Sequence, residues 1–136
     1  KIKSKIFTLL SDGECQEGTT WESLLIISKH NLNNLVLIID YNKIQALTTL
    51  EEGLPLSNLK MKIESFNINC INVRDGHSFT QINNAFLKLK KNIPNCIILN
   101  TLKGKGIKTF ENDPIWHARK IKGDDILLGK KSLKIR

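Results

Sequence analysis

Two short stretches of the sequence carry oxygen ligands of the kind that bind divalent cations. The first, SDGECQEG (11–18), places Asp12 directly after an apolar run, and the second holds Asn42 at the end of another, thirty positions later. Carboxylate and amide oxygens suit Mg²⁺ or Ca²⁺, and Mg²⁺ completes its octahedron with phosphate oxygens and water. Asp12 and Asn42, with a backbone carbonyl, therefore fit a metal-bridged diphosphate, although each alone is equally well explained as a turn residue.

Histidines are the next candidates for chemistry. His117 lies in the loop motif NDPIWH beside Trp116, which we expect to be a packing anchor. His77 follows a strand and precedes a helix, so fixing that turn is its favoured role. His30 closes a helix, where a cation is favourable, and it is assigned no function.

Lysine and cysteine side chains give weaker signals. Lys103 and Lys105, in KGKG, either steer an anionic ligand or belong to a flexible turn with solvated charges. The three cysteines are an odd number without C-x-x-C spacing, which fits neither a disulfide framework nor a zinc site. We expect Cys70 and Cys96 to be buried, and we disfavour a catalytic Cys15 because such a thiol needs a neighbouring base.

These residues need a scaffold, and the hydrophobic pattern predicts one. Short, continuous apolar runs are typical of strands covered on both faces, and they occur at 5–10, 35–40, 68–73 and 96–101. Segments with helical spacing lie between them at 19–31, 57–66 and 78–92, the last two capped by Ser57 and Ser78. The alternation predicts an α/β domain, a parallel sheet with helices on both faces.

Polar residues follow each predicted strand, at 12–14, 40–44, 74–78 and 102–106. Open α/β sheets bind ligands outside the carboxyl ends of their strands, so these residues should converge at one edge. Gly13 would let backbone N–H groups approach phosphates there, and the following helix would direct its positive end toward them.

Composition excludes few classes but disfavours several. The 136 residues suffice for one domain, and the longest apolar run is too short for a membrane span. The net charge of +8 suggests nucleic acid, but the lysines are scattered and aromatic residues for base stacking are few, so we expect no nucleic-acid partner. The basic tail GKKSLKIR reads as a solvated end. The amino terminus makes a poor secretory signal, which favours a cytoplasmic location.

Five motifs in order carry a family resemblance: DGECQEG followed by WE, NLVLIIDYNKIQ, DGH, LKGKG and NDPIWH. Together they resemble the diphosphate-binding domain of transketolase, from about Ile6 to His117. The QEG run favours transketolase over deoxyxylulose phosphate synthase and over the pyruvate decarboxylase type. The resemblance implies the thiamine diphosphate-binding fold for a partial domain over 1–136, with a motif core at about 5–117 and a basic tail at 118–136.

The resemblance also implies roles for individual residues. The metal ion, Mg²⁺ or Ca²⁺, would be bound by Asp12, the side chain of Asn42 and the backbone carbonyl of Ile44. The thiamine diphosphate cofactor would be contacted by Gly13, Glu14, Asn42 and His117. His117 would also be catalytic, because it reaches the sugar substrate or the reaction intermediate.

The implied activity is the transfer of two-carbon ketol units between sugar phosphates. Such enzymes need a second domain or subunit that supplies an activating glutamate, so the chain would be an enzyme component within a homo- or hetero-oligomer, with Glu17 facing a partner chain. The alternative is a truncated, non-catalytic module of the same fold that binds a cofactor or a partner. Three positions depart from the family pattern: Ser11 replaces a glycine, Ser78 an aspartate and Ala118 a glycine.

Overall fold

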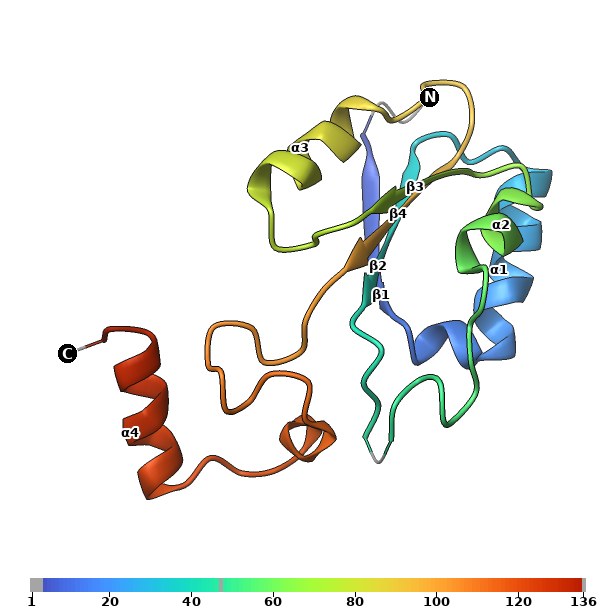
Figure 1. The fold of residues 1–136 in the computed structure, drawn as a ribbon. Helices are drawn as coiled ribbons and strands as arrows, with labels where there is room; N and C mark the ends of the chain where they lie inside the picture. The colour runs from blue at the N-terminus through green and yellow to red at the C-terminus, as the bar shows by residue number, and fades with distance from the viewer. Residues whose placement is uncertain (1–3, 47, 136) are drawn as a thin grey trace.

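The computed structural model describes residues 4–46 and 48–135 and contains a parallel four-stranded sheet (Figure 1). All three neighbouring pairs of strands run parallel, in the spatial order β1-β2-β4-β3. The strands are β1 (Ile6–Ser11), β2 (Leu35–Tyr41), β3 (Asn69–Val73) and β4 (Asn95–Asn100). The predicted α/β architecture is therefore confirmed, with strand ends within one residue of the expected positions.

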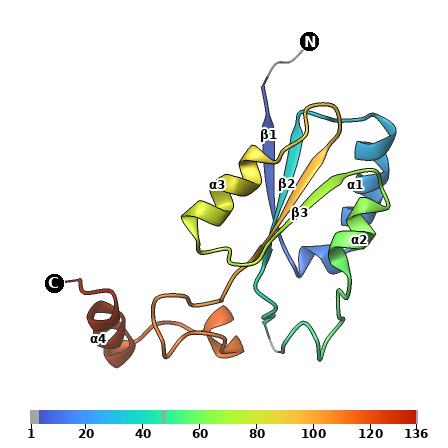
Figure 2. The same ribbon diagram turned by 45° about the horizontal axis from the view of Figure 1, so that its top comes forward.

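Helices cover both faces of this sheet, as predicted. Helices α1 (Gly18–Lys29) and α2 (Leu59–Glu64) lie on one face, and α3 (Phe79–Leu87) lies on the other (Figures 1 and 2). The short helical turns η1 (Glu14–Gln16) and η2 (Pro114–His117) and the helix α4 (Gly123–Ser132) complete the described chain. Within those residues, none of the helices combines the length and the apolar character that crossing a membrane requires.

The core is divided by the sheet into two unequal parts. On the α1 and α2 face, Leu24 and Ile63 pack with side chains from the strands such as Ile39 and Cys96. The part under α3 is smaller and is built around Ile97. Burying apolar side chains against both faces stabilises the central strands β2 and β4, which in turn fix where their carboxyl ends lie.

Strand β1 departs from the expectation of a strand covered on both faces. It lies at an edge of the sheet, where Ile6 is 49%, Phe7 52% and Leu9 68% exposed. Phe7 makes one edge-to-face contact with Phe86 of α3, with ring centroids 5.9 Å apart. A run of apolar residues therefore forms a strand whose apolar side chains are only partly covered by the described chain.

The predicted caps give one success and one error. Ser78 caps α3 as expected, because its Oγ accepts a hydrogen bond from the Gln81 N–H. Ser57 does not cap α2; the residue before that helix is Asn58, in the left-handed conformation with φ 58° and no side-chain cap. Both helices are also shorter than their predicted ranges.

The basic tail is not simply a solvated end, because α4 forms within it. The Asp125 carboxylate accepts a hydrogen bond from the Lys122 N–H at 3.0 Å and forms an ion pair with Arg119 at 3.1 Å. These two contacts fix the start of the helix. Gly129 is the buried residue of α4 and faces Ile107 of the preceding loop. This helix was not predicted.

Candidate functional site

A cleft of about 460 Å³ lies at the carboxyl edge of the sheet. The segments that follow β1, β2 and β4 meet at this edge, at the lower end of the sheet in Figure 1. The cleft is lined by Ser11, Asp12, Gly13, Glu14, Gln16, Glu17, Asp40, Asn42, Ile44, Gln45, Ala46, Lys103 and His117. The structure thus brings together all six residues named as site residues from sequence, and it adds Asp40 and Lys103 to them.

Asp12 is positioned by the end of β1 and is only 2% exposed. Its backbone N–H extends the pairing with β2 by donating to the Asp40 carbonyl at 3.2 Å. Its Oδ2 accepts the Lys43 N–H at 2.5 Å. Burial raises the pKa of this carboxyl; the N–H groups of Lys43 and Gly13 oppose the rise, and the charge of Asp40 adds to it.

Asn42 and Ile44 are held by the turn that follows β2. Asn42 Oδ1 accepts the Ile44 N–H at 3.0 Å, and its Nδ2 donates to Asp40 Oδ2 at 3.1 Å. Lys43, between them, has φ 67°, a left-handed conformation that lysine adopts only when its surroundings hold it there. Asp12 and Asn42 therefore bind successive N–H groups of one turn, which brings their side chains into the same corner of the cleft.

The donor set fits a hard divalent cation. A carboxylate has two oxygens and an amide oxygen two lone pairs, so Asp12 and Asn42 keep acceptor capacity beyond the backbone N–H groups that they bind. A buried carboxylate whose pKa is raised by desolvation and by a second carboxylate gains from a nearby positive charge. Among residues 4–46 and 48–135, no three His, Cys, Asp or Glu side chains are grouped so that they could bind a metal ion. A zinc site of the usual type is therefore not found in these residues.

Ser11 is part of a closed hydrogen-bonded box with Glu14. The Ser11 N–H and Oγ both donate to Glu14 Oε2, at 2.7 and 2.9 Å, and the Glu14 N–H donates to Ser11 Oγ at 3.2 Å. These bonds lower the pKa of the Glu14 carboxyl, the backbone N–H contributing most. A Cβ built on Gly13 would meet only Ser11 Oγ, at 3.8 Å, which is an ordinary contact distance, so the described chain does not crowd this glycine.

His117 reaches the cleft from the loop after β4. It ends η2, whose first turn is capped by Asp113 Oδ1, which accepts the Ile115 N–H at 3.0 Å. Trp116 stacks on Phe110 with ring centroids 3.7 Å apart, which confirms its predicted role as a packing anchor. This stack fixes the loop that carries His117.

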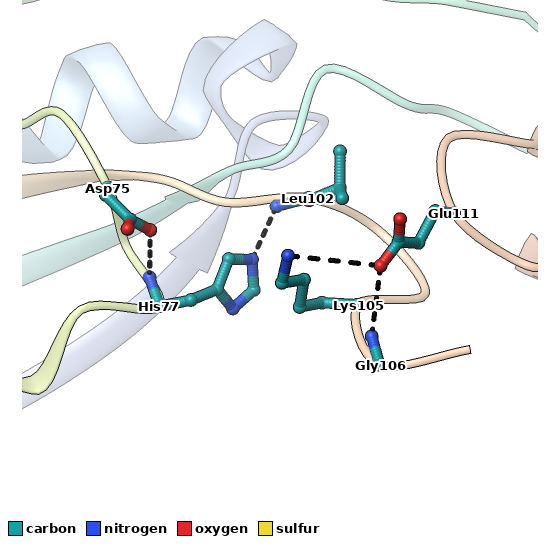
Figure 3. Close-up of polar contacts among 6 residues, drawn as sticks. All are labelled: Asp75, His77, Leu102, Lys105, Gly106 and Glu111. Carbon is teal, nitrogen blue, oxygen red and sulfur yellow. Dashed lines mark hydrogen bonds and ion pairs between the residues drawn. The ribbon is translucent and has the colours of Figure 1, made fainter. Parts of the chain in front are cut away.

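His77 fixes a turn, as predicted, and it also holds the start of the same loop (Figure 3). Its own N–H donates to Asp75 Oδ1 at 2.9 Å, and its Nε2 accepts the Leu102 N–H at 2.7 Å. The two lysines that follow Leu102 differ: Lys103 lines the cleft, whereas Lys105 forms an ion pair with Glu111 at 4.0 Å.

The cysteines behave as buried side chains. Cys70 and Cys96 are 5% and 0% exposed, which confirms the prediction for them, and Cys15 is 1% exposed. Burial, with the charges of Asp12 and Glu14, raises the pKa of the Cys15 thiol to about 11. A thiol in this state supplies little thiolate at neutral pH, which agrees with assigning Cys15 no catalytic role.

Two sets of hydrogen bonds in the site were not predicted from the sequence. Asp40 links Asn42 to the segment that follows β4. Its Oδ2 accepts a hydrogen bond from Asn42 Nδ2, and its Oδ1 accepts one from the hydroxyl of Thr101, the residue directly after β4. Gln45 and Gln16 tie the turns after β2 and β1 together by a side-chain bond of 2.7 Å.

Comparisons with known proteins agree with the geometry. A family model described as "Transketolase, thiamine diphosphate binding domain" matches residues 1–136. An apulose-4-phosphate transketolase subunit of Actinobacillus succinogenes is 34% identical over 133 residues, which are 97% of this chain and 48% of that protein. Transketolase of Homo sapiens is 34% identical over 119 residues, which are 88% of this chain and 19% of that protein.

The solved structures show the same correspondence. A transketolase from Campylobacter jejuni matches with a TM-score of 0.87 at 28% identity, covering 98% of this chain and 21% of that one. The chain therefore spans about half the length of the Actinobacillus relative and about a fifth of the two transketolases. The match of the family model over the whole chain and the shared fold lead to one conclusion: this chain belongs to the family of transketolase thiamine diphosphate-binding domains.

Proposed function

We propose that this chain is the part of a thiamine diphosphate-dependent transketolase that holds a divalent cation, Mg²⁺ or Ca²⁺, and through it the cofactor's diphosphate. The observation that carries the proposal is the placement of Asp12, Asn42, Ile44 and His117 around one cleft at the carboxyl edge of a parallel sheet. The assembled enzyme would transfer two-carbon ketol units between sugar phosphates.

The cation would be bound by the Asp12 carboxylate, the Asn42 side-chain oxygen and the Ile44 carbonyl. The buried position of Asp12 and the shared turn at 42–44 support this assignment, because both limit the freedom of the ligands before the cation arrives. Phosphate oxygens and water would complete the coordination.

The diphosphate would lie along Gly13 and Glu14, with Asn42 in contact. The uncrowded surroundings of Gly13 support this placement, as does the proximity of α1, whose first-turn N–H groups attract anions. Lys103 in the same cleft adds a positive charge for the cofactor or for a sugar phosphate.

His117 would act on the substrate. Thiamine diphosphate supplies the carbanion chemistry when bound. The imidazole, held on η2 by the Trp116–Phe110 stack, would hydrogen-bond the substrate's oxygen or move a proton to it. Its exposed position at the cleft leaves it accessible to a sugar phosphate.

The proposal includes a partner that supplies the remaining part of the site, including an activating glutamate. The exposed apolar side chains of β1 support a protein partner, and Glu17, exposed beside the cleft, would face it in a homo- or hetero-oligomer. The Actinobacillus relative, about twice as long, is named as a subunit, which favours a split enzyme. A cytoplasmic location, the division at residue 117 and the absence of nucleic-acid and membrane partners stay predictions.

The test is cofactor binding by the chain together with the polypeptide that completes it. Calorimetry should detect thiamine diphosphate binding with Mg²⁺ or Ca²⁺ and its loss with a chelator. Asp12→Ala should abolish both the affinity and its metal dependence, whereas Asp124→Ala, at an exposed position on α4, should change neither. Unchanged metal-dependent binding by Asp12→Ala would refute the site.

The alternative is a non-catalytic module that binds the cofactor or a partner. This alternative is kept because the chain matches only about a fifth of a transketolase, and most of such an enzyme lies outside the matched region. An assay of ketol transfer separates the two functions. Metal-dependent cofactor binding with no transfer, in the presence of the completing polypeptide, would favour the module.

A further inference from the structure

The Leu102 backbone is held by a side chain that can change its protonation state. The Leu102 N–H donates to Nε2 of His77 at 2.7 Å (Figure 3). A ring nitrogen accepts a hydrogen bond only while it carries no proton, because protonated imidazole is a donor at both nitrogens. The contact therefore exists in the neutral form of His77 and is lost in the charged form.

The segment after Leu102 transmits this anchor to the cleft. Lys103 lines the cleft beside Asp12 and is the next residue in the chain. Gly104 follows with φ 75°, packed so closely on the Phe110 backbone that an added Cβ would lie 2.3 Å from its carbonyl oxygen. The Asn112 N–H donates to the Lys103 carbonyl at 3.0 Å. The loop is thus tied to itself, and His77 ties it to the turn after β3.

We propose that His77 is a positioning residue: its neutral imidazole fastens Leu102 and so directs Lys103 toward the cleft, and its protonation releases both. The proposal rests on the proposed function, in which the cleft receives a diphosphate and a sugar phosphate. His77 itself contacts the loop, not the ligands. The consequence is that affinity for the anionic ligand falls when a lower pH protonates the His77 imidazole and breaks this contact.

The surroundings of His77 carry charges of both signs. Asp75, on its own turn, accepts the backbone N–H of His77. His77 lines a hollow whose other charged lining residues are Asp40 of β2 and, from the loop after β4, Lys103 and Lys105. The pH response is therefore compared between variants that keep this set of charges intact.

The first experiment reads the contact directly. In the assembled protein, hydrogen exchange of the Leu102 amide should be about tenfold faster in His77→Leu than in the native chain at pH 7.5, as expected for the loss of one hydrogen bond. His77→Gln should restore part of the protection, since its amide oxygen can accept the same N–H. Equal exchange in the native chain and in His77→Leu would overturn the proposal.

The second experiment reads the consequence, with thiamine diphosphate and Mg²⁺ as the probe. Between pH 8 and pH 5.5, the native affinity should fall about three- to tenfold more than the affinity of His77→Gln, which cannot titrate. Both proteins retain His117, so the difference isolates His77. His30→Gln, the same substitution at the end of α1, should follow the native profile.

Identical pH profiles for the native protein and His77→Gln would overturn the role of His77 in ligand binding. If the native protein shows the protected Leu102 amide but binds no cofactor at pH 8, the contact stands and the proposed function fails. The two experiments therefore distinguish an error in this inference from an error in the function on which it rests.

Discussion

The cleft has two walls that are built in different ways. One wall, formed by Asp12, Asn42 and Ile44, consists of strand ends and is fixed by the pairing of β1 with β2 and by short backbone contacts. The other wall, with Lys103 and His117, is a loop held by the His77 side chain from the turn after β3 and by the Trp116–Phe110 stack within the loop. In the proposed function, the groups that would bind a cation lie at the strand ends, and the groups that would contact a larger, variable ligand lie on the loop.

Besides the loss of binding expected for Asp12→Ala, a large effect should follow from a change at Asn42 in the strand-end wall. Asn42→Ala removes a proposed ligand oxygen and the acceptor of the Ile44 N–H, so we expect Mg²⁺-dependent cofactor affinity to fall at least about 10- to 100-fold. Calorimetry on the assembled protein measures this change. Asn83→Ala, at an exposed position on α3, is the matched control, and an equal loss in both variants would contradict the assignment.

A change that affects only the backbone should destabilise the loop that carries Lys103 and His117. Gly104→Ala places a Cβ against the Phe110 carbonyl at a positive φ, and we expect a loss of about 1–3 kcal/mol in the free energy of unfolding, measured by urea denaturation. Gly123→Ala, where an added Cβ meets nothing within 4 Å, should cost far less. Similar losses would mean that the loop accommodates the Cβ by rearranging.

A change of charge at Asp12 should separate stability from binding. Burial raises the pKa of Asp12, so the ionised carboxylate is less stable in the folded than in the unfolded state. Asp12→Asn keeps an acceptor for the Lys43 N–H, and we expect it to stabilise the metal-free protein at neutral pH while it abolishes metal binding. The gain should vanish as the pH falls below the ordinary value of 3.8, where the native carboxyl is protonated in both states.

Denaturation of both proteins between pH 7 and pH 3.5, in chelator, measures this difference. A variant that is less stable than the native protein at pH 7 would show that the carboxylate is stabilised by its neighbours rather than penalised by burial.

The smallest effect should come from Ser11→Ala. Removing the hydroxyl takes one of the two Ser11 donors from Glu14, so the lowered pKa of that carboxyl should rise toward its ordinary value without reaching it, because the backbone N–H remains. A carboxyl titration followed by NMR detects the change. An unaltered titration of Glu14 would mean that the hydroxyl contributes nothing to this box.

The difference between the walls also explains what could be predicted from sequence. Asp12, Asn42 and Ile44 were predictable because each follows a recognisable strand, and parallel strands bring their carboxyl ends to one edge. Lys103 was expected at the same edge because it follows a strand, but the contacts that hold its loop, such as that of His77 with Leu102, were not, because no local pattern encodes them. The helix α4 was missed because its apolar residues, Ile126 to Leu128, are consecutive and show no helical period.

Strand β1 has a practical consequence. A six-residue, aliphatic and aromatic edge strand offers unpaired backbone groups and apolar side chains to any similar strand, which is the route by which chains self-associate and precipitate. We expect the isolated polypeptide to be poorly soluble and its recovery from cells to improve when the completing polypeptide is produced with it. Solubility on co-expression then becomes a simple screen for the natural companion of this chain.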